Sequence, residues 1–89
     1  MSIKKFDISN ELIFADGFDE AILGIAYRLG DHPIVAYDSG KIIEILMSRD
    51  GMSYEEAVEY FDFNVEGAYV GERTPCYINT KIKIEEIKP

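Results

Sequence analysis

The pattern of apolar and polar positions between Asp50 and Arg73 predicts one amphipathic helix with well-marked ends. Ser53 followed three residues later by Glu56 is the sequence pattern of a capping box, which fixes the start. Gly67 follows the last periodic position and suits a left-handed C-cap. The helix is therefore expected over about residues 53–66.

Three kinds of side chain divide the surface of this predicted helix. An apolar stripe, expected to pack on a sheet, comprises Tyr54, Ala57, Val58, Phe61 and Val65. Carboxylates at successive spacings of four, three and four residues form one flank, which consists of Glu55, Glu59, Asp62 and Glu66. Two aromatic residues lie nearly opposite the apolar stripe: Tyr60 and Phe63.

The acidic flank has no basic neighbours, because no Lys or Arg occurs between Asp50 and Glu72. Like charges at helical spacing repel by a few tenths of a kcal/mol per pair. A solvated flank is one interpretation, and a docking strip for a basic partner is the other, since binding would relieve the repulsion. A cation site is disfavoured, because carboxylates on a straight helix seldom converge on one ion.

Two neighbouring aromatic residues, Tyr60 and Phe63, would stand in water if the helix only covered a sheet. A second layer of the same chain would cover them, and we prefer this interpretation. Alternatively they anchor a partner or a homodimer, because Tyr and Phe are enriched at interfaces.

Before this helix, the pattern favours strands. A short apolar run, Leu12–Ala15, ends at the turn dipeptide Asp16-Gly17 and is interpreted as a strand. The segment Ala21–Arg28 fits either a helix or a strand. A strand is preferred, because Pro33–Asp38 is strand-like and the intervening polar loop would close a hairpin.

A first helix is expected from Gly40 to about Arg49, capped by Asp38 or Ser39. Its apolar residues cover too wide an arc for one interface, so it should be buried on two sides. Residues 74–79 are interpreted as a last strand. The tail either extends that strand or stays mobile.

These elements predict an α+β fold in the order βββααβ. It consists of a small antiparallel sheet of about three to four strands with two α-helices packed on one face. Residues 1–89 are expected to form a single domain with its core at about 11–79, so that 1–10 and 80–89 are peripheral.

Composition limits the function classes. The 89 residues carry a formal net charge of −8 with a pI near 4.5, which argues against binding nucleic acid through its phosphates. A protein with a basic surface is the better partner. No apolar run suggests a signal peptide or a membrane span, and the single Cys76 fits a reducing compartment. A cytoplasmic protein is expected.

Candidate chemistry is sparse. His32, the only histidine, lies in a Asp-His-Pro turn where an exposed loop residue is the default. Three polar residues, Asp16, Asp38 and Asn64, could line a pocket between the sheet and the helices. The chain has no residue pattern of a recognised catalytic or metal site and no phosphate-binding loop, so we expect no cofactor.

The runs A-D-G-F-D-E-A-I-L-G, V-A-Y-D, I-I-E-I-L-M and D-G-M-S-Y-E-E-A-V-E-Y-F-D-F-N-V-E-G-A-Y-V-G-E-R-T-P occur in that order. Together they resemble a family of small uncharacterised proteins encoded by many tailed phages and some bacteria. The resemblance covers roughly Leu12 to Ile78. It implies a phage accessory or host-interaction protein in the host cytoplasm, with no catalytic residue to carry over.

Two functions follow. The preferred one is a non-enzymatic protein that binds and modulates a host or phage protein through the acidic flank, the aromatic pair or both. The alternative is a small ligand-binding or sequestering protein, or a small enzyme, with a carboxylate-lined pocket between sheet and helices.

Overall fold

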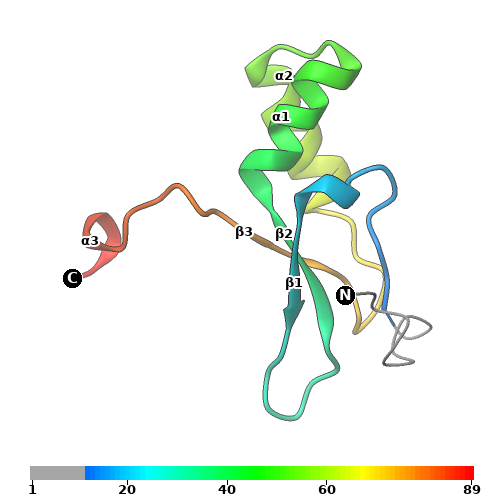
Figure 1. Ribbon diagram of the computed structural model, residues 1–89, viewed down its shortest axis with the longest axis vertical. Helices are drawn as coiled ribbons and strands as arrows, with labels where there is room; N and C mark the ends of the chain where they lie inside the picture. Colours follow the sequence, from blue (N-terminus) through cyan, green and yellow to red (C-terminus); the bar gives the residue numbers. More distant parts are fainter. Residues whose placement is uncertain (1–11) are drawn as a thin grey trace.

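Three short strands in the order β1, β2, β3 form the sheet of this α+β fold (Figure 1). The computed structural model describes residues 12–89. β1 (Ile22–Ala26) and β2 (Ile34–Asp38) pair antiparallel, which confirms the predicted hairpin. β3 (Cys76–Ile78) pairs parallel to β2, so the expectation of an antiparallel sheet is wrong for this strand. Two helices lie between β2 and β3 and provide the long crossover connection that a parallel pair of strands requires.

The apolar run Leu12–Ala15 is not a strand, contrary to the prediction. Its backbone is held by a side chain instead: the Ala15 N–H donates to the Tyr37 hydroxyl over 2.7 Å. Leu12 is nevertheless buried in the core. The run therefore contributes apolar contacts without joining the sheet. The Asp16-Gly17 turn is confirmed, with Gly17 at a φ of 88°, and a short 3-10 helix, η2 (Asp19–Ala21), leads into β1.

Helix α1 (Ser39–Asp50) begins where β2 ends and closely matches the predicted helix. The Asp38 carboxylate accepts from the backbone N–H groups of Gly40 and Lys41, which is the predicted capping role. Gly51, in the left-handed region with a φ of 71°, ends the helix. The wide apolar arc is largely buried, with Ile42, Ile45 and Leu46 in the core.

The second predicted helix begins as expected but changes its winding before it ends. α2 (Tyr54–Tyr60) continues into a π-helical turn, η3 (Phe61–Val65), in which the Glu66 N–H donates to the Phe61 carbonyl over 2.7 Å. Gly67 does not have the left-handed conformation that the sequence pattern suggested. It fits for another reason: a Cβ there would lie 2.6 Å from the Asp62 carbonyl oxygen.

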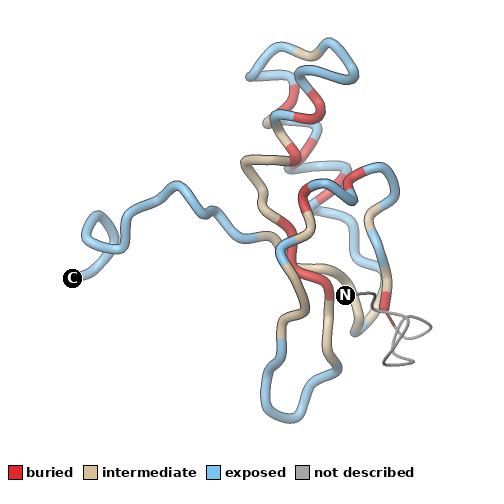
Figure 2. Tube along the Cα trace, viewed as in Figure 1, coloured by how far each residue is buried: buried red, intermediate tan, exposed pale blue. Residues whose placement is uncertain are grey.

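The core lies where the sheet meets α1, α2 and η3 (Figure 2). The ring of Tyr37 stacks on that of Tyr77 at 5.7 Å, and Phe61 meets Tyr77 edge-on at 5.3 Å. Along the predicted apolar stripe, Ala57, Phe61 and Val65 are buried. Tyr54 is exposed, so its assignment to the core was wrong.

The C-terminal tail leaves the sheet and points away from the helices (Figure 1). It contains one short exposed helix, α3 (Ile84–Ile87), which neither sequence alternative anticipated. Its beginning is held by side chains: Thr80 donates to Asp38, and Lys81 lies 3.5 Å from Glu44. The predicted peripheral position of residues 1–10 falls outside the described part of the chain.

Candidate functional site: the exposed faces of α2 and η3

The start of α2 is fixed by the predicted capping box. The Glu56 N–H donates to the Ser53 hydroxyl over 3.2 Å, and the Ser53 N–H donates to the Glu56 carboxylate over 2.8 Å. This second bond lowers the pKa of the Glu56 carboxyl below its ordinary value. The capping box fixes where the helix begins, and the buried stripe fixes its rotation about its own axis relative to the core. Together they determine which side chains face outward.

The four predicted flank carboxylates, Glu55, Glu59, Asp62 and Glu66, are all exposed. Within residues 12–89, none of the four forms a salt bridge, whereas other surface acids such as Asp31 and Glu44 do. Their negative charge is therefore not balanced by an ion pair with any side chain of the described residues. This leaves it available to a positively charged group from outside the described chain.

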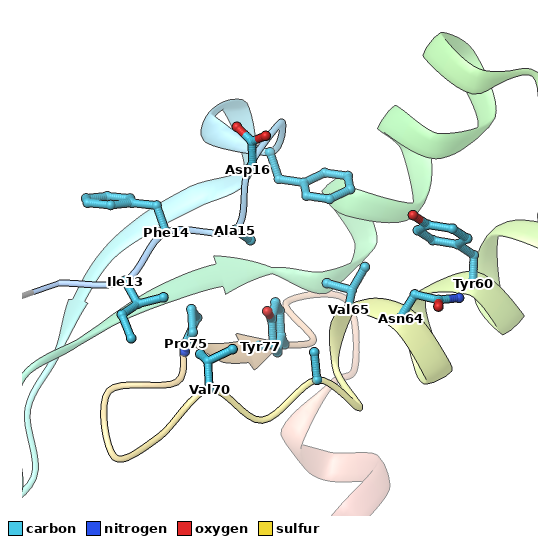
Figure 3. A pocket seen from close by; sticks show the side chains of 12 residues that line it. Ile13, Phe14, Ala15, Asp16, Tyr60, Asn64, Val65, Val70, Pro75 and Tyr77 are labelled. Atoms are coloured by element: carbon cyan, nitrogen blue, oxygen red, sulfur yellow. The ribbon is translucent and has the colours of Figure 1, made fainter.

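The aromatic pair has two different environments. Phe63 projects into solvent with 75% of its surface exposed, and Tyr60 is 40% exposed. Tyr60 lines a pocket together with other segments of the chain (Figure 3), and this pocket is not the covering second layer that the sequence suggested. Phe63 lines only two shallow surface hollows and has no such cover among the described residues.

The two hollows lie on either side of Phe63 and share Glu59. One, of about 310 Å³, is lined by Tyr54, Glu55, Val58, Glu59, Asp62 and Phe63. The other, of about 290 Å³, is lined by Met52, Glu56, Glu59, Tyr60, Phe63 and Asn64. We call the set Tyr54, Glu55, Glu59, Asp62 and Phe63 the acidic-aromatic surface.

The sequence prediction did not include Tyr54 in this surface, although the spacing of residues along the helix indicates it. Tyr54, Val58 and Asp62 form one row at i, i+4 and i+8. Glu55, Glu59 and Phe63 form the next row with the same spacing, so two adjacent helical rows line the larger hollow. The predicted Glu66 is exposed beyond these rows and lies outside both hollows.

The predicted polar pocket is only partly assembled. Asp16 and Asn64 line one pocket of about 230 Å³, together with Tyr60 and Tyr77 (Figure 3). Asp38 does not line it, because its carboxylate caps α1 and also accepts a hydrogen bond from the Thr80 hydroxyl over 3.1 Å. Of the three possible pocket residues, Asp16 and Asn64 therefore line one pocket and Asp38 lies outside it.

A further polar contact joins the β1–β2 loop to the loop before β3. His32 is half exposed, as predicted. Its Nδ1 lies 3.1 Å from the Arg73 guanidinium and its Nε2 lies 3.5 Å from the Glu72 carboxylate. Cys76 lines the adjacent hollow of about 610 Å³ with His32 and Glu72. Arg73 and Glu72 were not singled out from the sequence, because their approach to His32 depends on the position of β3.

Residues 12–89 bring together no group of three or more histidine, cysteine or acidic side chains that could bind a metal ion. The same residues include no helix with the length and apolar character needed to cross a membrane. No protein-family model, curated protein or solved structure matches the chain significantly. The resemblance to phage-encoded proteins therefore stays a prediction.

Proposed function

We propose that this protein is a non-enzymatic accessory protein that binds and modulates a host or phage protein through the acidic-aromatic surface. The main support is the exposure of Phe63, whose side chain is 75% exposed between two hollows. The carboxylates around it have no salt-bridge partner in residues 12–89. An exposed aromatic ring beside a hollow is typical of an interface anchor.

The two components of the surface would contribute differently to binding. Burying a Phe side chain stabilises a complex by about 1.5–3 kcal/mol, so Phe63 would supply affinity. An exposed ion pair contributes only about 0.2–1 kcal/mol, so the carboxylates would mainly accelerate association and exclude acidic competitors.

The chemistry of the partner follows from this division. The hollows are lined by both apolar and acidic side chains, so the best-matched partner presents Lys or Arg residues beside an apolar side chain. A second copy of this chain is a poor match, because a two-fold contact would bring the same carboxylates of both copies together. Nucleic acid is disfavoured for the same electrostatic reason.

A quantitative pull-down from bacterial lysate, with and without phage infection, tests the proposal. The bait is the wild-type protein or the variant Glu59→Lys with Asp62→Lys. The matched control is Glu85→Lys with Glu86→Lys on the exposed helix α3. Both double variants change the formal net charge from −8 to −4, because each reversal contributes two units.

The proposal predicts a basic protein that is retained by the wild type and the control, is lost from the α2 and η3 variant, and elutes at moderate salt. Phe63→Ser should lose the same protein. Equal retention by all baits would mean that the acidic-aromatic surface is only a solvated helix face.

A further inference from the structure

A second concave site lies behind the acidic-aromatic surface, in the pocket of about 230 Å³. Its lining comes from three parts of the chain: the segment before β1, the α2 and η3 helix, and the segment that leads into β3 (Figure 3). Most of the lining is apolar, and it includes Ile13, Val65, Val70 and Pro75. A concave, mainly apolar site with a few polar groups is the usual form of a small-molecule site.

The polar groups of this pocket include the Tyr60 hydroxyl, the Asn64 amide and the Tyr77 hydroxyl, of which Tyr77 lies in the middle of the lining (Figure 3). The ring of Tyr77 is held firmly, because Tyr37 stacks on one side and Phe61 meets it edge-on. The Tyr37 hydroxyl accepts a hydrogen bond from Ala15, whereas in the described part of the chain no hydrogen bond involves the Tyr77 hydroxyl. A fixed polar group without a partner is available to a ligand.

The charge of the pocket limits what can occupy it. Among residues 12–89, Asp16 is the only charged residue in the lining, and Figure 3 shows its carboxylate pointing away from the other side chains. Burial raises the pKa of the Tyr77 hydroxyl, and nearby Glu66 raises it further, so this group stays protonated at neutral pH. The described lining offers an anionic ligand one carboxylate, Asp16, and no Lys or Arg to balance its charge.

We propose that this pocket binds a small, uncharged and largely apolar molecule that carries one hydroxyl or carbonyl oxygen, to which the Tyr77 hydroxyl donates a hydrogen bond. The volume is below the range of about 300–1,000 Å³ that is typical for drug-sized ligands, so a single-ring compound suits it. This site goes beyond the proposed protein-binding function and does not depend on it.

Benzyl alcohol, toluene and benzoate are suitable probes, because they share one ring and differ in the polar group. Binding is followed by methyl NMR of Ile13, Val65 and Val70. The wild type should show saturable shifts with benzyl alcohol, weaker binding of toluene by between about two- and tenfold, and no saturable binding of benzoate. Tyr77→Phe should reduce the affinity for benzyl alcohol to that for toluene.

Two control variants separate this role from general effects. Tyr27→Phe removes a hydroxyl from an exposed ring outside the pocket and should change nothing. Ala68→Leu should narrow the pocket and weaken both neutral probes. Because the Tyr77 hydroxyl has no partner in the described chain, Tyr77→Phe should keep its thermal stability, so a loss of binding would not reflect unfolding.

Three results would overturn the proposal: no saturable shift with either neutral probe, equal affinity for benzyl alcohol and toluene in the wild type, or an unchanged preference for benzyl alcohol in Tyr77→Phe.

Discussion

Substitution of Gly67 tests the π-helical ending of the second helix, η3, which contains Phe63. A Cβ at Gly67 would lie 2.6 Å from the Asp62 carbonyl oxygen and 3.2 Å from that of Phe63. Real Cβ atoms essentially never come within 3.0 Å of another atom of this kind, so the 2.6 Å contact cannot be kept. Gly67→Ala must therefore displace the backbone of η3.

Gly67→Ala should lower the free energy of unfolding by about 1–3 kcal/mol, which is the usual effect of forcing extra atoms into a packed site. Gly67→Asn should cost at least as much, because Asn has the same Cβ. Gly51 provides the contrast, since its φ is 71° and a Cβ there would meet nothing within 4 Å. Gly51→Ala should cost about 1 kcal/mol through its left-handed backbone alone, and Gly51→Asn should cost less, because Asn tolerates that conformation.

Urea denaturation and thermal melts of the four variants measure these costs. For a domain of this size, 1 kcal/mol corresponds to a shift of about 4–8 °C in Tm. A Gly67→Asn protein that is clearly more stable than Gly67→Ala would contradict the π-helical ending, since that ranking is typical of a left-handed cap. That result would support the interpretation of Gly67 as a left-handed C-cap, which the sequence pattern suggested.

Four further substitutions test stability. Ser53→Ala should lower the free energy of unfolding by about 1 kcal/mol, because the cap is lost. Phe61→Ala should lower it by about 3 kcal/mol or more, because a cavity opens in the core. If Phe61→Ala were as stable as the parent in urea, the assignment of Phe61 to the buried face would be wrong. Because folding lowers the pKa of Glu56, its contribution is present above the ordinary value of 4.5 and is lost as the pH falls below it. Glu56→Gln should therefore show a smaller fall in Tm on acidification, and an unchanged pH profile would show that the capping bond is weak in solution. Phe63→Ser should change stability by no more than about 0.5 kcal/mol, since the ring has little contact to lose; a larger loss on melting would mean that the ring is covered.

The correct sequence predictions rest on local interactions. The start of α2 is determined by Ser53 and Glu56, which are three residues apart, and the start of α1 by Asp38 and the N–H groups that immediately follow it. The β1–β2 hairpin likewise joins neighbouring segments. In each case the residues that determine the structure lie within one short stretch of sequence.

The incorrect predictions involve contacts between distant segments. The direction of β3 depends on where two helices return the chain, and the path of residues 12–15 depends on a hydroxyl 22 positions away. The role of Asp38 was only half predicted for the same reason, because the bond from Thr80 crosses from the tail. The candidate surface was largely predictable because it lies on one helix, whereas the pocket combines three segments and was not.

The central claim, that α2 and η3 present a docking surface for a basic partner, is tested most directly by NMR titration of the ¹⁵N-labelled protein with a peptide of alternating Lys and Leu residues. We expect saturable shifts confined to about residues 52–64, and these shifts should weaken when salt is raised from about 50 mM to about 500 mM. The shifts should be lost in Glu59→Lys with Asp62→Lys and retained in Glu85→Lys with Glu86→Lys. Shifts spread evenly over all exposed carboxylates, including Glu20, Glu44 and Glu85, would contradict the claim.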